Sequence, residues 1–157
     1  GAGNRRLATR QLEMHLLDAS ARHGGVCFVM LDIDHFKPIN DTYGHDVGDE
    51  VLVGFTRRLR RTVRPTDLVC RMGGEEFGII MHYTRAENYK PSSLNRVLSS
   101  INQRPFKTTA GDLPVTASIG VYFYNGLGDV PSVLQVVKAA DEKLYEAKNN
   151  GRNQIAD

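Results

Sequence analysis

The chain has 157 residues, of which 41% are hydrophobic and 24% charged, and its formal net charge at pH 7 is +2. These values are typical of one globular domain with a full hydrophobic core, and no apolar run reaches the roughly 18 residues that a bilayer span needs. So small a net charge does not argue for binding to nucleic acid, and we expect this domain to contact neither nucleic acid nor a membrane.

The first residues, GAGN (1–4), show neither the pattern of a signal peptide nor a hydrophobic stretch. We interpret them as a remnant of cloning that is followed by a start in mid-helix. On this interpretation the chain is one part of a longer protein. We expect the domain to be cytoplasmic, while attachment of the longer protein to a membrane is left open.

The first half of the chain alternates between helical and strand patterns. Helical spacing, ended by the glycines of RHGG (22–25), is shown by Leu7, Leu12, Leu16 and Ala19. The continuous apolar run VCFVMLDID (26–34) ends in carboxylates and predicts a buried central strand. Apolar residues at close to i, i+4 spacing from Val47 to Val63 predict a second helix that Pro65 stops.

The second half predicts a hairpin over residues 68–82, a polar loop and a weaker helix in SSLNRVLSSINQ (92–103). A strand over 113–124 and a last helix closed by NNGRN (149–153) follow. The order is therefore helix, β-α-β-β-α-β, helix. It predicts an α+β fold of the ferredoxin-like kind, with a central, mainly antiparallel sheet flanked by helices.

The predicted hairpin contains an unusual turn, because RMGGEEFGII (71–80) places two glycines and two glutamates between apolar residues. In a ferredoxin-like sheet the end of the first strand approaches this turn, so we expect three or four carboxylates to converge, from the set Asp32, Asp34, Glu75 and Glu76. Close carboxylates raise one another's pKa unless a cation neutralises them. Oxygen ligands favour Mg²⁺ or Mn²⁺, which leave coordination positions open for phosphate oxygens.

An isolated Asp at a strand end is more often a cap or turn residue than a ligand. Here the following segment, DHFKPINDTYGHDVGDE (34–50), supplies complementary groups. Lys37 can neutralise phosphate, and Asn40 and Asp49 offer an amide and a carboxylate at separations that suit a planar base. The combination favours a site for a phosphorylated nucleotide.

Two further features have simpler interpretations. The basic run RRLRRTVR (57–64) is read first as the solvated face of a helix, with a binding patch as the alternative. Cys27 and Cys70 each lie in an apolar strand-like run without a nearby partner, which is typical of reduced core residues.

Three ordered motifs resemble those of the GGDEF-domain diguanylate cyclases: LDIDHFKPINDTYGHDVGDEVL (31–52), RMGGEEF (71–77) and DEKLYEAKNNGRN (141–153). The resemblance spans nearly the whole chain and implies a single catalytic domain over residues 1–157. It also implies that the DxLTGLxNRR lead-in is truncated to NRR and that a sensory domain is absent. The family's fold is palm-like and related to nucleotidyl cyclases. Its reaction condenses two GTP into cyclic di-GMP at a homodimer, and GGEEF is an active variant of its signature.

The resemblance also implies residue roles. Asp32, the Ile33 carbonyl and Glu75 correspond to the Mg²⁺ ligands, and Glu75 is also assigned as general base for the 3′-hydroxyl. A metal-bound carboxylate is a poor base, so Glu76 is an alternative holder of the metal or the proton. The catalytic set is thus Glu75, Glu76 and Lys37.

The implied substrate-binding residues form a longer set: Phe36, Lys37, Asn40, His45, Asp49, Gly73, Gly74, Lys148 and Arg152. Asn40 and Asp49 would select guanine, while Lys148 and Arg152 would grip the distal phosphates. For this last pair the alternative is a contact with the helix C-terminus, with Gly151 as the C-cap. A structural role is an equal alternative for His45.

The segment RPTD (64–67) lies five residues before GGEEF, as does the family's RxxD inhibitory site. Arg64 and Asp67 would there bind cyclic di-GMP, the product, away from the catalytic centre. The alternative is a loop that ends a helix, in which Asp67 is only a cap.

Two other functions compete with an active cyclase. One is a catalytically silent module that binds GTP or cyclic di-GMP. The other is a palm-fold nucleotidyl cyclase with a different product, against which Asn40 and Asp49 argue.

Overall fold

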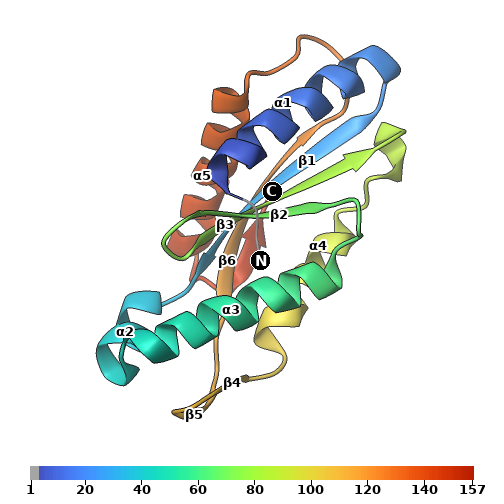
Figure 1. Cartoon of the computed structure of the whole chain (residues 1–157). Coiled ribbons are helices and arrows are strands. Elements are labelled where there is room, and N and C mark those ends of the chain that lie inside the picture. The colour runs from blue at the N-terminus through green and yellow to red at the C-terminus, as the bar shows by residue number, and fades with distance from the viewer. Residues whose placement is uncertain (1–3) are drawn as a thin grey trace.

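A computed structural model describes residues 4–157 and shows a five-stranded sheet in the order β2-β3-β1-β6-β7 (Figure 1). The strands are β1 (Gly25–Ile33), β2 (Leu68–Gly73), β3 (Glu76–Tyr83), β6 (Ala117–Tyr124) and β7 (Gln154–Ala156). Only β7 pairs in parallel, with β6. The order β2-β3-β1-β6 is the ferredoxin-like arrangement that the element order predicts, so the predicted fold class is confirmed.

Helices cover both faces of the sheet. They are α1 (Arg5–Arg22), α2 (Phe36–Tyr43), α3 (His45–Thr62), α4 (Ser92–Asn102) and α5 (Val133–Asn149), with one 3₁₀ turn, η1 (Ala86–Asn88). A separate hairpin, β4 (Phe106–Thr108) and β5 (Gly111–Leu113), lies beside α3. No helix within residues 4–157 is long and apolar enough to cross a membrane.

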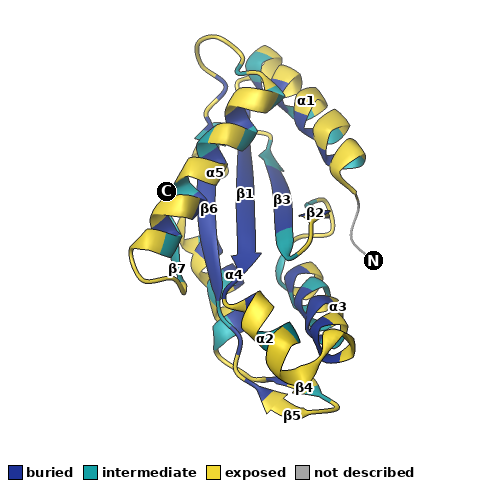
Figure 2. Ribbon diagram, turned by 90° about the vertical axis from the view of Figure 1, so that its left-hand side faces the viewer, coloured by how far each residue is buried: buried dark blue, intermediate teal, exposed yellow. Residues whose placement is uncertain are grey.

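Every residue of β1 is buried, as the unbroken apolar run predicts (Figure 2). Alternate side chains enter two separate cores, because successive residues of a strand point to opposite faces. One core contains Val29 and Leu31 together with apolar residues of α3 and α4. The other contains Phe28 and Met30 together with apolar residues of α1 and α5. The central strand is thus held between two helical layers.

The cysteines divide between these cores, Cys27 in the first and Cys70 in the second. Both are free and buried. Burial raises the pKa of the Cys27 thiol to about 12 and that of Cys70 to about 11. Both thiols therefore stay protonated near neutral pH and are unreactive core residues.

The beginning of α1 differs from the expectation. Residues 1–3 of GAGN lie outside the described part of the chain, but Asn4 is the N-cap of α1. Its side-chain oxygen accepts a hydrogen bond from the Leu7 N–H at 2.9 Å. The helix therefore begins at Arg5 with a satisfied cap, and the predicted start in mid-helix is wrong.

Four short elements and one boundary also escape the sequence patterns. Helix α2 has only eight residues, and its apolar stripe of Phe36 and Ile39 is too short to distinguish the segment from a loop. The hairpin strands β4 and β5 and the edge strand β7 have three residues each, too few to show a periodicity. The strand expected over 113–124 begins at Ala117, because Leu113 belongs to the separate hairpin.

Close packing of α5 on β6 depends on Gly120. A Cβ atom built on this residue would lie 2.2 Å from the backbone nitrogen of Leu144 and 2.3 Å from the carbonyl oxygen of Ala140. Contacts that short do not occur, so any side chain here would push α5 off the sheet. Glycine thereby brings the last turns of α5 close to the strands.

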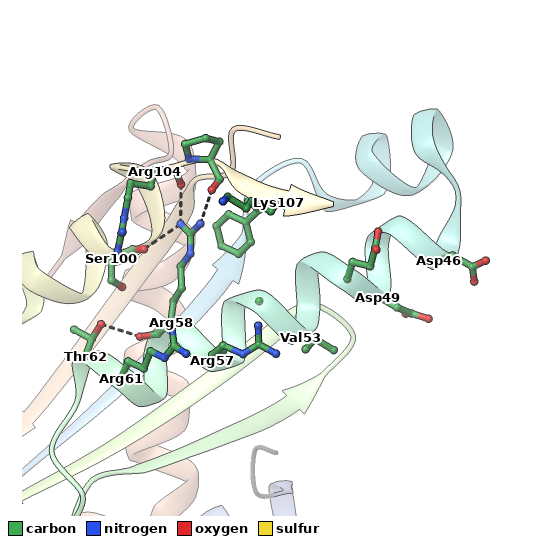
Figure 3. Close-up of a pocket in the computed structure, with 14 residues that line it drawn as sticks. Asp46, Asp49, Val53, Arg57, Arg58, Arg61, Thr62, Ser100, Arg104 and Lys107 are labelled. Carbon is green, nitrogen blue, oxygen red and sulfur yellow. Dashed lines mark hydrogen bonds between the residues drawn. The ribbon is translucent and has the colours of Figure 1, made fainter. Parts of the chain in front are cut away.

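The basic run 57–64 is a solvated face only in part. Arg57 and Arg61 are exposed, but Arg58 turns toward the segment that follows α4 (Figure 3). Its guanidinium lies 3.7 Å from the centre of the Phe106 ring. It also donates hydrogen bonds of 2.6–3.2 Å to four carbonyl oxygens, those of Ser100, Ile101, Arg104 and Pro105. Arg58 thus satisfies carbonyls at the end of α4, which have no partner within the helix.

Replacing the Arg58 guanidinium should loosen the packing of α3 against α4. We expect Arg58→Lys to lower the free energy of unfolding by roughly 1–3 kcal/mol, because an ammonium cannot reproduce the planar set of donors. Urea denaturation measures the loss. Arg57→Lys, an exposed change one residue away, is the matched control and should leave stability nearly unchanged. Equal effects of the two substitutions would contradict the role given to Arg58.

Candidate functional site

The end of β1 meets the glycine turn between β2 and β3. In the antiparallel register Asp32 pairs with Glu76, and the Ile33 N–H donates to the Glu75 carbonyl oxygen at 3.3 Å. Gly74 has φ 51°, a left-handed conformation that favours glycine in this turn. The prediction that the strand end approaches the GGEE turn is therefore confirmed.

Asp32 is buried and forms an ion pair with Lys148, which lies near the end of α5. Burial raises the pKa of Asp32, and the negative charges of Glu75 and Asp34 raise it further, while the pair with Lys148 opposes the shift. Removal from water therefore outweighs the attraction of the lysine. A second cation would stabilise the ionised form of this carboxylate.

Glu76 is half-buried on the neighbouring strand. Burial raises its pKa, as do Asp32, Asp141 and Glu75, while Lys148 lowers it. Three carboxylates therefore influence one another at this sheet end: those of Asp32, Glu75 and Glu76. A cluster of carboxylates that repel one another is a common sign of a functional site.

Asp34 has hydrogen-bond donors of its own, so three of the four candidate carboxylates meet at the turn, as the lower of the two expected numbers predicts. The Asp34 carboxylate accepts hydrogen bonds from the Thr116 hydroxyl at 2.7 Å and the Ser118 hydroxyl at 2.6 Å. The backbone N–H of Asn153 donates a third bond at 3.0 Å. These donors occupy both oxygens of the Asp34 carboxylate, so its hydrogen bonds hold neighbouring segments of the fold together.

In the described part of the chain, no group of three or more His, Cys, Asp or Glu side chains is arranged to hold a metal ion. The donor chemistry nevertheless fits a hard divalent cation. Asp32 and Glu75 offer carboxylate oxygens, and Ile33, the last residue of β1, offers a carbonyl. The ammonium of Lys148 already takes the place of a cation on Asp32.

A second part of the predicted site lies between α2 and α3. The Asn40 side-chain oxygen is buried and has no hydrogen-bond partner within residues 4–157. A Cβ atom at Gly48 would lie 1.8 Å from it, so glycine at this position lets the Asn40 side chain pack against α3. His45 and Asp49 are exposed on the same helix as Gly48, and Phe36 is buried at the start of α2. A buried acceptor without a donor is suited to a ligand N–H group.

The predicted phosphate-binding side chains have different surroundings. Lys37 is exposed on α2, where it pairs with Asp41 at 3.0 Å. Arg152 follows α5 and has φ 62°. Its N–H donates to the Ala147 carbonyl oxygen, and the Gly151 N–H donates to that of Lys148. This is the Schellman pattern. Asn150 is the C-cap itself, and Gly151 is the residue after it.

The RPTD segment lies in the loop between α3 and β2. Arg64 donates to the Asp67 carboxylate at 2.7 Å and to the His82 carbonyl oxygen at 2.9 Å, and its guanidinium lies 4.6 Å from the centre of the Tyr83 ring. Asp67 also accepts the Arg64 backbone N–H at 2.8 Å. A cavity of about 320 Å³ beside this pair is lined by Arg96 as well. The loop is thus ordered by its own ion pair.

A larger groove, of about 760 Å³, runs between α3 and residues 100–107 (Figure 3). Asp49 lines its acidic end, but neither Asp32 nor Glu75 borders it. Its size therefore does not mark it as the place of the chemistry.

Three residues with a role at the sheet end were not predicted. Thr116 and Ser118 hold Asp34, and Arg71 donates from its Nε to the Gly74 carbonyl oxygen at 2.8 Å in the turn. Ser118 is completely buried in an otherwise apolar strand. A lone hydroxyl in an apolar run is the signal that could have indicated a buried polar partner.

The fold and this sheet end define an α+β domain in which a strand-end carboxylate faces a Gly-Gly turn. The sequence matches the family described as "Diguanylate cyclase, GGDEF domain" over residues 1–154, so the chain belongs to that family.

The chain is 44% identical to the response regulator PleD of Caulobacter vibrioides over 99% of its own length, but it spans only about a third (34%) of PleD. Two solved structures are similar over 99% of the chain. The GGDEF domain of DgcB from Caulobacter crescentus, in complex with c-di-GMP, has a TM-score of 0.87, 30% identity and 90% coverage. The active GGEEF domain of a diguanylate cyclase from Vibrio cholerae has a TM-score of 0.86, 28% identity and 97% coverage.

The raised pKa of Glu76 has a consequence for stability. The folded state binds the Glu76 proton more tightly than the unfolded state does. The contribution of Glu76 to the free energy of unfolding is therefore greatest below the ordinary pKa of 4.5, and it is lost as pH rises through the raised folded value. We therefore expect Glu76→Gln to flatten this part of the pH profile and to raise the midpoint of thermal unfolding at pH 7.

Thermal scans over a series of pH values from about 4 to about 8 would measure both effects. Glu142→Gln, an exposed change on α5, is the control and should leave the profile in place. A Glu76→Gln profile parallel to that of the unmodified chain would show that Glu76 does not carry this dependence.

Proposed function

We propose that the chain is a diguanylate cyclase domain that condenses two GTP into cyclic di-GMP and pyrophosphate. The observation that carries the proposal is the meeting of Asp32 with the Glu75–Glu76 turn, where raised pKa values mark carboxylates in need of a cation. The family membership and the active GGEEF domain from Vibrio cholerae support it. A single catalytic domain over residues 1–157 within a longer protein agrees with the one-third coverage of PleD.

Mg²⁺ or Mn²⁺ would be held by Asp32, the Ile33 carbonyl and Glu75, and when bound would acidify the attacking hydroxyl and neutralise phosphate charge. Lys148 would then leave Asp32 for a phosphate oxygen. Such an exchange conserves the number of favourable pairs, because each anion keeps one cation. This lysine can therefore neutralise Asp32 before the cation binds and contact the substrate afterwards.

The 3′-oxygen of one GTP attacks the α-phosphorus of the other, and pyrophosphate leaves in line; the reciprocal attack closes the ring and releases a second pyrophosphate. Glu75 or Glu76 receives the proton of the 3′-hydroxyl. Burial raises the pKa of Glu76, which is the direction that a general base working near neutral pH requires. Lys37, Lys148 and Arg152 hold the phosphates.

The turn leaves room for the triphosphate. A Cβ atom at Gly73 or Gly74 would meet no described atom within 4 Å, so the chain itself does not fill the space beside them. Glycine here lets a phosphate oxygen approach the backbone closely.

Guanine would be recognised between α2 and α3. The unpartnered Asn40 oxygen can accept from a base N–H, and the exposed Asp49 carboxylate can accept from guanine N1–H and its exocyclic amine. Adenine presents an acceptor where guanine presents a donor, which leaves buried groups unpaired. Phe36 and His45 flank this region on α2 and α3.

Each domain binds one GTP, so catalysis requires two domains to face each other as a homodimer. Their encounter supplies the proximity that a single domain lacks. The partners are therefore GTP, cyclic di-GMP and a second copy of the chain.

Removing Glu75 should stop product formation. The test incubates the chain, fused to a dimerising coiled coil, with GTP and Mg²⁺ and separates the nucleotides by chromatography. Glu75→Ala should lower the rate at least about 100-fold, the scale expected when a group that stabilises the transition state is lost. Glu142→Ala is the control and should retain activity.

Two results would favour the other functions. GTP binding without product in the unmodified chain would support the silent binding module. Faster turnover of ATP than of GTP in a parallel reaction would support a cyclase with another product.

We also propose that Arg64 and Asp67 form an inhibitory site for cyclic di-GMP. The cavity beside them and the c-di-GMP complex of DgcB support the proposal. Arg64 offers a planar guanidinium that is already held over Tyr83, and binding there would couple two distinct sites.

Arg64→Ala should weaken inhibition by added cyclic di-GMP by at least about tenfold, since a charge-assisted bidentate contact is lost. Initial rates at increasing product concentration give the inhibition constant. Arg61→Ala removes an exposed arginine from the end of the neighbouring helix and serves as the control. Unchanged inhibition in Arg64→Ala would rule out this site.

A further inference from the structure

Asp34 connects the site strand to the segment after α5. It lies one residue past β1 and is 5% exposed. Its own N–H donates to the Thr116 carbonyl oxygen at 2.9 Å, and its carboxylate accepts from Thr116, Ser118 and the Asn153 backbone. The hydroxyls fix the carboxylate on β6 and the loop before it, so that the carboxylate presents a fixed acceptor to Asn153.

The backbone that Asp34 holds is unusual. Arg152 and Asn153 have φ 62° and 48°, two consecutive left-handed residues that carry a Cβ atom. Such a conformation is unfavourable and persists only where surrounding contacts impose it. Arg152 N–H is held by α5 through Ala147, and the Asn153 side chain accepts from Asn102 on α4. The bond to Asp34 is the contact that ties this backbone to the end of β1.

We propose that Asp34 is a positioning residue that places Arg152 for the distal phosphates of GTP. Asp34 stands two residues from Asp32, so the same strand end that presents the metal-binding carboxylate also fixes the distance to Arg152. The inference rests on the proposed function, because the phosphate role of Arg152 is proposed there. Asp34 touches no ligand in this assignment and acts through the Asn153 backbone.

The number of phosphates on the ligand separates positioning from general stability. GMP lacks the β- and γ-phosphates that Arg152 would contact, whereas loss of folded protein weakens GTP and GMP equally. The experiment measures dissociation constants of both nucleotides with the whole chain by titration calorimetry in Mg²⁺. It compares the unmodified chain with Arg152→Ala, Asp34→Ala, Asp34→Asn and Ser118→Ala.

We expect Asp34→Ala to weaken GTP binding about tenfold while leaving GMP binding nearly unchanged, and Arg152→Ala to do the same. The double variant Asp34→Ala/Arg152→Ala should be no weaker than Arg152→Ala, because both changes remove one contact. Asp34→Asn should restore the preference for GTP, since its amide oxygen can still accept from Asn153. Ser118→Ala removes a bond to Asp34 but not the one to Asn153, and should lower stability alone.

Asp34→Ala leaves the buried Ser118 hydroxyl and the half-buried Thr116 hydroxyl without their acceptor and can fail to fold. The combined variant Asp34→Leu/Thr116→Val/Ser118→Ala replaces the whole polar group by apolar side chains and is expected to fold. It still removes the acceptor of the Asn153 N–H, so it should show the same loss of preference for GTP.

The outcomes distinguish the two proposals. If Arg152→Ala weakens GTP binding but Asp34→Ala and the combined variant do not, the positioning role is overturned and the proposed function stands. If Arg152→Ala leaves the preference for GTP unchanged, the phosphate role in the proposed function is wrong, and the inference about Asp34 is overturned with it.

Discussion

The antiparallel register between β1 and β3 is the constraint on which the candidate site depends. It pairs Asp32 with Glu76 and brings the Glu75 carbonyl to the Ile33 N–H. A slip by one residue would turn every side chain of β1 to the opposite face of the sheet, so Asp32 would point away from Glu76. The register is therefore specified by the burial of both faces of β1, in which Phe28 and Val29 enter different cores. Hydrophobic packing, rather than any contact within the site, sets where the carboxylates meet.

The same dependence explains why much of the fold could be predicted from the sequence. The unbroken apolar run of β1 and the regular apolar spacing in α3 indicate which residues are buried. Burial of those residues is what stabilises these two elements, so both could be predicted. Helix α2 has eight residues and strand β7 only three, so any apolar pattern in them is too short to identify the element. The meeting of strand end and turn could be predicted because the topology alone brings them together. The direction in which each carboxylate points could not, since it depends on partners distant in the chain.

Asp34 and Arg58 show this limit at single residues. Asp34 stands two residues from Asp32 and has the same side chain, yet Ser118 and Thr116, more than 80 residues away, take up its oxygens. Arg58 lies in a run of similar arginines, yet it alone of Arg57, Arg58 and Arg61 reaches the carbonyls after α4. A charged side chain in a sequence pattern shows that a charge is present. Only the three-dimensional neighbours decide whether that charge stabilises the fold or meets a ligand.

The electrostatics of the sheet end connect the fold to the proposed chemistry. Packing buries Asp32 and half-buries Glu76, and this burial is the largest cause of their raised pKa values. Burial of an incompletely neutralised carboxylate is unfavourable. In this group of carboxylates, Lys148 forms an ion pair with Asp32. Binding of a divalent cation would relieve that cost, so part of the affinity for the cation would arise from the folding of the strands. The hydrophobic cores that fix the register therefore also contribute to the proposed cation site, because they hold the carboxylates where solvation by water is incomplete.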